Sequence, residues 1–248
     1  MKRWLLFLAL LAASGTAWAA EPSGAAPSNT PVAAPGTPAA ATSAVATPAV
    51  ATPAVATPAA ATPGNVQPDA AAPIAALNAG LLAGMKAAAT ENFAARAAAL
   101  GPVIDRSFDL ATILHNAIGL RWNTLPADQQ TALLKAFRNF TIATYVSNFA
   151  SNDGTHFAML PEQRDVGADV IVESQILPAS GEPVRIDYLM RKGAIGWQAV
   201  DVLLEGTISR VAVTRSDFRS LLDSNDASRL IADLRKKTKT LSGGAVDE

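Results

Sequence analysis

Few residues in this sequence have the types and the spacing that catalysis or metal binding requires. Cysteine is absent, which excludes disulfides, thiolate chemistry and Cys-ligated metal sites. The two histidines, His115 and His156, are far apart in the sequence, so a His-rich metal site is not expected. The motifs of serine hydrolases, P-loop proteins, zinc proteases and dinucleotide-binding domains are missing. We therefore predict no catalytic residues, no metal and no cofactor.

Acidic residues in the second half of the chain provide one alternative with catalytic chemistry. Asp187 and Tyr188 are adjacent on a predicted strand and so point to opposite faces, which weakens an acid/base pair built from them. A lone carboxylate in a pocket is still an option for Asp201. Structural ion pairs are the favoured role of the surrounding charges, which are Arg185, Asp187, Arg191 and Glu205.

The first twenty residues have the pattern of a secretory signal peptide. Lys2 and Arg3 precede an apolar run, and small residues follow up to Ala20. The run is shorter than the roughly 20 apolar residues that a membrane-spanning helix needs. We predict residues 1–20 to be a signal peptide that is cleaved after export from the cytoplasm, with a retained membrane anchor as the alternative.

Residues 21–72 form a segment rich in Ala, Thr and Pro. Ten of the 16 prolines occur here, whereas Leu, Ile, Phe, Met, Trp and Tyr do not occur at all. Proline removes backbone donors, and such a segment cannot bury enough apolar surface to offset its chain entropy. We predict a disordered linker, followed by one folded domain over residues 73–241 and a flexible tail over 242–248.

Three helices are predicted in the first half of the domain. Residues 73–100 are rich in Ala, Leu and Met, and Gly101 and Pro102 then favour a stop. Asp109 is suited to cap a second helix with one apolar face. The third helix covers residues 126–148, and its apolar residues occupy more than one face. It therefore has to be covered on two sides.

Alternation of apolar and polar residues predicts three strands, near residues 166–173, 184–191 and 195–204. Short turn segments between them favour an antiparallel meander. The third strand is apolar at almost every position and is predicted to be central. His156 follows a turn sequence and is predicted to lie in a loop. The helical period then returns in two further segments.

This order of elements predicts an α+β fold, in which a curved antiparallel meander packs against several helices. The third helix and the third strand provide more apolar surface than one compact layer needs, which fits an apolar cavity. A solid core would use the same residues, and both interpretations are open from the residues alone. The balance of 20 Lys and Arg against 21 Asp and Glu disfavours nucleic acid as a partner.

Several short motifs occur in a specific order over residues 73–241. They are Phe108-Asp109-Leu110, Pro126-x-Asp128-Gln129-Gln130, Asp187-Tyr188-x-x-Arg191, Gly196-Trp197, Asp201-Val202, Glu205-Gly206-Thr207-Ile208-Ser209 and Arg215-Ser216-Asp217-Phe218. Together they resemble the MlaC family, the toluene-tolerance type of periplasmic lipid-binding proteins. Within that family, the Gly-Thr-Ile-Ser sequence and the Asn148-Phe149 segment with Gly154 are similar to the hopanoid-associated HpnM branch.

The resemblance implies a carrier without catalytic activity, which binds the hydrocarbon part of a phospholipid or hopanoid between sheet and helices. It also implies transient contact with an inner-membrane lipid transporter complex of the ABC type. A sixteen-carbon chain, at about 0.8 kcal/mol per CH₂, needs cover for roughly 12 kcal/mol of hydrophobic driving force. The predicted lining consists of Phe137, Tyr145, Phe149, Ile186, Tyr188, Val202, Leu204 and Ile208. Arg191 and Arg215 are candidates for contact with a head group or the transporter, with ion pairing inside the protein as the alternative.

Two other classes of function are alternatives. One is a small pocket enzyme that uses Asp201. The other is an interaction module with a solid core, in which the Ala-Thr-Pro segment carries the function.

Overall fold

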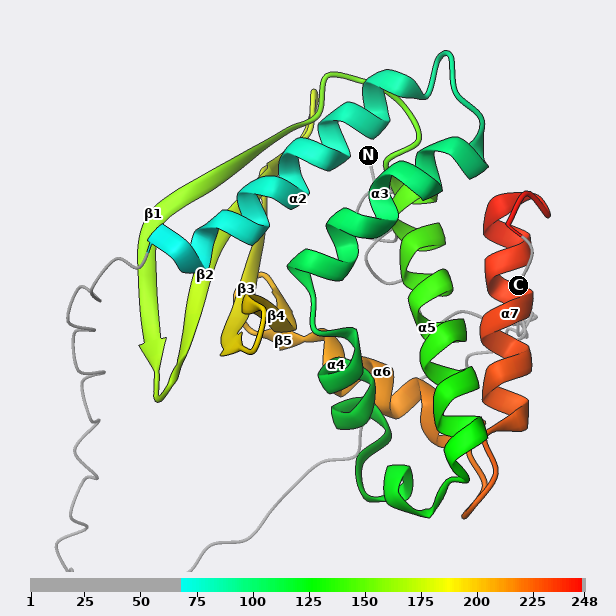
Figure 1. Ribbon diagram of the computed structural model, residues 1–248. Coiled ribbons are helices and arrows are strands. Elements are labelled where there is room, and N and C mark those ends of the chain that lie inside the picture. The colour runs from blue at the N-terminus through cyan, green and yellow to red at the C-terminus, as the bar shows by residue number, and fades with distance from the viewer. Residues whose placement is uncertain (1–67, 247–248) are drawn as a thin grey trace, which may run out of the picture. The chain divides into compact units, whose positions relative to one another are not determined.

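The computed structural model describes residues 68–246, which contain six α-helices, one 3₁₀ helix and a five-stranded antiparallel sheet. The predicted signal peptide, the linker up to residue 67 and the last two residues of the tail lie outside the described residues. Helix α2 crosses the sheet, and α5 and α7 lie beside each other farther from it (Figure 1). The predicted α+β class is confirmed.

The segment predicted as one helix consists of two. These are α2 (Pro68–Ala87) and α3 (Phe93–Ser107). Asn92 caps α3 by accepting the backbone N–H of Ala95 at 2.9 Å, because its side chain can satisfy a free donor at the start of a helix. The first turn of α2 occupies the end of the stretch predicted to be linker.

Helix α4 begins where the sequence predicts. Asp109 caps α4 (Leu110–Ile118), and its carboxylate accepts the backbone N–H of Thr112 at 2.9 Å. The 3₁₀ helix η1 (Gly119–Thr124) connects α4 to the next helix.

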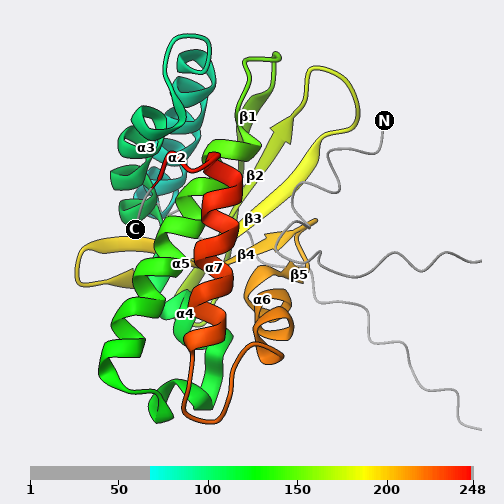
Figure 2. The same ribbon diagram turned by 90° about the vertical axis from the view of Figure 1, so that its right-hand side faces the viewer.

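Helix α5 (Ala127–Asn148) follows Pro126, as predicted, and is covered on two sides. Helix α7 (Ser228–Ser242) packs along one side of α5, whereas α3 and α4 contact it elsewhere (Figure 2). This arrangement explains why apolar residues occupy more than one face of α5.

Glycines allow α3 to approach its neighbours closely. Gly101 and Pro102 lie inside α3, so the predicted helix stop at this position is wrong. A Cβ atom on Gly101 would lie 3.3 Å from a guanidinium nitrogen of Arg138 on α5, and one on Gly80 of α2 would lie 3.2 Å from Val103. The close helix contacts therefore favour glycine at both positions.

The sheet is a meander in the order β1-β2-β3-β4-β5. Its strands are β1 (His156–Val166), β2 (Asp169–Leu177), β3 (Val184–Gly193), β4 (Gly196–Leu204) and β5 (Ile208–Ser209). Strands β2 to β4 correspond to the three predicted strands. The first of them starts later than expected, because Gly167 adopts a positive φ of 64° in the turn before it.

Strand β1 is absent from the sequence-based prediction. His156 is its first residue, which corrects the expectation of a loop at this position. The register with β2 shifts between Met159 and Gln163, on either side of Pro161. Such a bulge breaks the alternation of apolar and polar side chains, so the pattern of a strand is hidden in the sequence.

The middle strand of the sheet is β3, so the prediction that β4 is central is wrong. The short β5 pairs only with Leu203 and Leu204 of β4. Strand β4 is apolar for another reason, because the segment between α3 and α4 packs against it. The backbone N–H of Asp109 donates to the carbonyl of Ala199 at 3.0 Å, and Ala199 and Trp197 are buried there.

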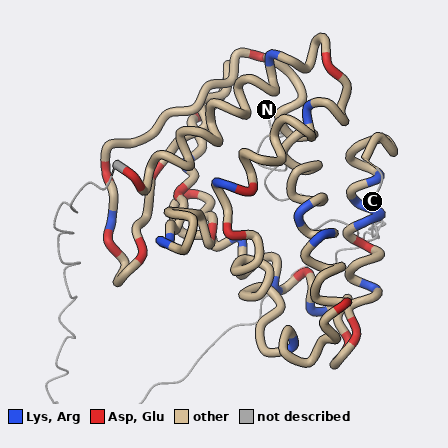
Figure 3. The backbone as a smooth tube through the Cα atoms, in the orientation of Figure 1, with Lys and Arg blue, Asp and Glu red and all other residues tan. Residues whose placement is uncertain are grey.

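The last two helices close the fold. Ser209 caps α6 (Arg210–Arg219) by accepting the backbone N–H of Ala212 at 3.0 Å. Helix α7 buries Leu230, Ile231 and Leu234, and several Lys and Arg residues occur along the same helix (Figure 3). This amphipathic pattern packs α7 against α5.

Two carboxylates are buried side by side on the sheet and are neutralised by two arginines. Glu173 and Asp187 are opposite each other in the register of β2 and β3 and are 3% and 0% exposed. Arg164 reaches them at 2.8 and 3.1 Å, and Arg185 reaches them at 2.6 and 2.9 Å. The predicted ion pairing of Arg185 with Asp187 is confirmed. These bonds raise the pKa of Arg185, and the hydrogen bond to Asp187 is the largest cause.

The length and composition of residues Asp69–Ala87 would also suit a membrane span. In this fold, however, Ile74, Leu77 and Leu81 of α2 are buried in the main core. The apolar character of α2 is therefore used for packing against the sheet and α3.

Candidate functional site

A cavity of about 480 Å³ lies between the sheet and the helices α5 and α6, and most of its lining is apolar. Protein interiors normally contain few voids larger than a water molecule. A void of about 150 Å³ can hold benzene, so this volume corresponds by proportion to roughly twenty carbon atoms. The interior therefore does not close into a solid core.

A row of five aromatic rings follows the cavity. Phe108, which precedes α4, lies with its ring centroid 6.2 Å from that of Tyr188 and 5.8 Å from that of Tyr145. Tyr145 stacks on Phe149 at 6.3 Å, and Phe149 meets Phe157 of β1 at 5.4 Å. All five residues line the cavity, so one wall is a continuous apolar surface.

The structure brings six of the predicted lining residues together at the cavity, namely Phe137, Tyr145, Phe149, Ile186, Tyr188 and Val202. Leu204 and Ile208 do not line it. These two residues pair with each other where β4 meets β5, and Ile208 is 49% exposed. Leu204 is two residues from Val202 and therefore lies on the same face of β4, but the cavity does not extend that far along the strand. That the six lining residues contact a ligand remains a prediction.

The two arginines predicted to contact a head group or a partner lie outside the cavity lining. Arg191 forms an exposed ion pair with Asp169 at 2.6 Å, and this hydrogen bond is the main cause of its raised pKa. Arg215 donates to the backbone carbonyl of Asn116 at 2.6 and 3.1 Å. Both side chains therefore have partners within the protein.

Asp201 lines the cavity, but its carboxylate holds the start of α6 in place. It accepts the backbone N–H groups of Val202 at 2.7 Å and Val211 at 3.1 Å, together with the hydroxyl of Ser209. Within residues 68–246, no group of three or more His, Asp or Glu side chains could hold a metal ion. These contacts give Asp201 a structural role at the junction of β4 and α6.

Sequence reasoning missed several residues of the lining. Phe108 belongs to a motif that the sequence contains, but nothing in the local pattern shows that it faces a cavity. Thr141 and Thr144 stand on the α5 face between aromatic residues, and their hydroxyls donate to the carbonyls of Phe137 and Phe140 at 2.9 and 2.7 Å. Arg210 was missed because the direction of α6 relative to the sheet depends on tertiary contacts.

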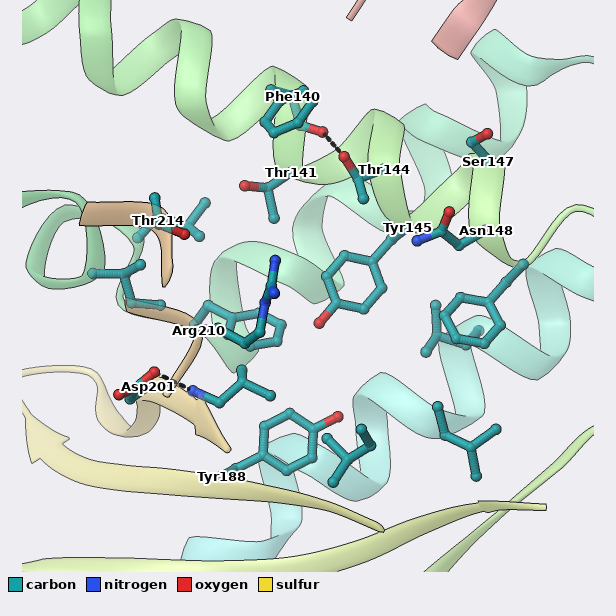
Figure 4. A pocket seen from close by; sticks show the side chains of 18 of the residues that line it. Phe140, Thr141, Thr144, Tyr145, Ser147, Asn148, Tyr188, Asp201, Arg210 and Thr214 are labelled. Atoms are coloured by element: carbon teal, nitrogen blue, oxygen red, sulfur yellow. Dashed lines mark hydrogen bonds between the residues drawn. The ribbon is translucent and has the colours of Figure 1, made fainter. Parts of the chain in front are cut away.

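The cavity also contains polar groups in an apolar setting (Figure 4). Burial raises the pKa of the Tyr145 hydroxyl well above its usual value, and burial likewise raises that of Tyr188. Burial lowers the pKa of the Arg210 guanidinium, which the charge of Asp217 opposes. Both tyrosines are therefore neutral, and Arg210 stays charged because a guanidinium keeps its proton in proteins even when its pKa is lowered.

The fold and the cavity define a class of protein, in which helices and an antiparallel sheet enclose an apolar chamber. A family model described as MlaC protein matches residues 78–236, so the chain belongs to the MlaC family. The fold is similar to that of the phospholipid-binding protein from Ralstonia solanacearum, solved in complex with a phospholipid. The two chains share 22% identity at a TM-score of 0.59, over 70% of this chain and 99% of the other. A search of curated proteins gave no significant match.

Proposed function

We propose that this protein is a periplasmic lipid carrier, which holds the hydrocarbon part of a phospholipid or a hopanoid in its cavity. The protein is exported by its first twenty residues. It exchanges lipid with an ABC-type transporter complex of the inner membrane through transient contact, and it catalyses no reaction.

The observation that carries this proposal is the apolar cavity of about 480 Å³. Removing a hydrocarbon chain from water gains about 0.8 kcal/mol per CH₂, provided that apolar walls replace the water. The row of aromatic rings and the side chains of Ile186 and Val202 provide such walls. A carrier needs this surface, and it needs no reactive group.

The finer parts of the proposal have different support. Membership of the MlaC family and the phospholipid in the similar Ralstonia structure support a lipid ligand and a carrier function. The sequence motifs that are similar to the HpnM branch support a hopanoid as the ligand. The pattern of residues 1–20 supports export.

The test is to identify the molecule that the natively folded protein retains. The full-length chain is produced in a bacterium that makes both phospholipids and hopanoids, and is purified from the osmotic-shock fraction without detergent. Native mass spectrometry then measures the bound mass, and solvent extraction identifies the lipid. We expect one lipid per protein and a mature chain that begins at Glu21.

A protein that carries no lipid after this procedure, and takes none up from vesicles that contain both lipid classes, would contradict the carrier function. Recovery with the membrane pellet and an uncleaved N-terminus would contradict the predicted export as a free protein. The lipid class found decides between phospholipid and hopanoid.

A further inference from the structure

Two hydrogen-bond donors point into the cavity without an acceptor. Figure 4 shows the side chain of Arg210 extending into the space between Thr141 and Tyr188, and the Tyr145 hydroxyl directed towards the same space. Among residues 68–246, neither the Arg210 side chain nor the Tyr145 hydroxyl forms a hydrogen bond, and no ion pair of Arg210 lies within 4.0 Å. A ligand that fills this space takes water away from both donors, which is costly unless the ligand supplies an acceptor.

The nearby carboxylates do not supply the missing acceptor. Asp201 attracts Arg210 only at a distance, because its oxygens already accept hydrogen bonds from the chain around Ser209 and Val211. Asp217 lies two turns along α6 from Arg210 and is not part of the cavity lining. Its attraction raises the pKa of Arg210, but burial has the larger effect and lowers it.

The hydroxyls of Thr141 and Thr144 donate to backbone carbonyls of α5, and within residues 68–246 neither hydroxyl oxygen accepts a hydrogen bond from Arg210. A ligand atom that satisfies this region must therefore accept hydrogen bonds from Arg210 and Tyr145. Carboxylate and phosphate oxygens do so best, because a guanidinium binds them with two parallel charge-assisted bonds.

We propose that the cavity recognises a lipid by an anionic oxygen group, a carboxylate or a phosphate, which accepts hydrogen bonds from Arg210 and Tyr145. This inference rests on the proposed function as a lipid carrier and specifies the ligand of the same cavity. The hydrocarbon part then lies along the aromatic row from Phe108 to Phe157.

Ligands with the same hydrocarbon chain and different polar ends test this proposal. The full mature protein is freed of lipid, and palmitate, its methyl ester, 1-hexadecanol and a lysophosphatidate with the same chain compete with a bound fluorescent hydrocarbon probe. We expect palmitate or the lysophosphatidate to bind at least about tenfold more tightly than the ester and the alcohol. The tighter of the two identifies the carboxylate or the phosphate as the source of the anionic group. Equal affinity for all four would overturn the proposal.

Two substitutions assign the effect to the residues. We expect Arg210→Gln to weaken binding of the anionic ligand by roughly tenfold to a hundredfold and to leave the methyl ester unaffected. Tyr145→Phe removes one neutral donor, so a loss of about threefold to tenfold is expected. Arg215→Gln is the matched control, because Arg215 is on the same helix and bonds outside the cavity.

A loss that is equal for the ester and the anion, or as large in Arg215→Gln as in Arg210→Gln, would also overturn the proposal. If Arg210→Gln does not fold, the comparison of ligands on the wild type is decisive by itself. A wild type that retains lipid but shows no preference for an anionic end disproves this inference alone. A protein that binds none of the ligands disproves the carrier function as well.

Discussion

Filling the cavity from the sheet side should block lipid binding and leave the fold intact. Val202 is suited to this test, since it lines the cavity from β4 and is directly opposite Tyr188 in the strand register. It is only partly buried, so a larger side chain can extend into the empty space. The perturbation is Val202→Trp.

The size of the effect follows from the cavity volume. The tryptophan side chain has about seven more non-hydrogen atoms than that of valine. A benzene-binding cavity of about 150 Å³ provides about 25 Å³ per carbon atom, so these atoms fill roughly 175 of the cavity's volume of about 480 Å³. They displace about six or seven carbons of the ligand. At about 0.8 kcal/mol per CH₂ the loss is about 5 kcal/mol, which weakens binding more than a thousandfold.

The assay is native mass spectrometry of the purified variant, with circular dichroism and thermal unfolding as checks of the fold. Leu204→Trp is the control, because Leu204 is on the same strand but outside the cavity lining. We expect Val202→Trp to lose its lipid and Leu204→Trp to keep it. A folded Val202→Trp protein that carries as much lipid as the wild type would refute the assignment of this cavity as the lipid site.

Three further predictions concern stability. Asp187→Asn removes the buried charge that two arginines share, and should lower the free energy of unfolding by about 2 kcal/mol in urea titrations. This is less than the cost of breaking a fully buried ion pair, because both arginines are partly exposed. An unchanged unfolding midpoint would contradict this. Gly84→Ala should raise the free energy of unfolding by about 0.5–1 kcal/mol, since no atom lies within 4 Å of the new Cβ. Gly101→Ala should raise it less, because a guanidinium nitrogen of Arg138 would lie 3.3 Å from the new Cβ. Equal gains in stability would show that this close contact is unimportant. Burial raises the pKa of Asp217, so the folded state binds its proton more readily than the unfolded state does. As the pH falls through this raised value towards the ordinary 3.8, the wild type should gain stability relative to Asp217→Asn, and parallel profiles of unfolding free energy against pH would contradict this.

The sequence by itself determined the elements whose causes are local. Asp109 can cap a helix because its side chain reaches the backbone donors of the next turn, and Pro126 favours a helix start for the same short-range reason. Alternation along β3 places Ile186 and Tyr188 on one face wherever the strand lies. These features, and the α+β class that they define, depend on neighbours within a few residues.

Tertiary structure decided what depends on distant neighbours. Strand β1 is held by pairing with β2 despite Pro161, and Gly101 lies within a helix because α5 packs closely against it. Whether Val202 lines the cavity and Leu204 does not depends on where helices cover the sheet. The direction of Arg210 depends on how α6 leaves the sheet. The same apolar residues could have closed into a solid core, and a cavity remains because the distance between sheet and helices is set by contacts across the whole domain, which no local pattern records.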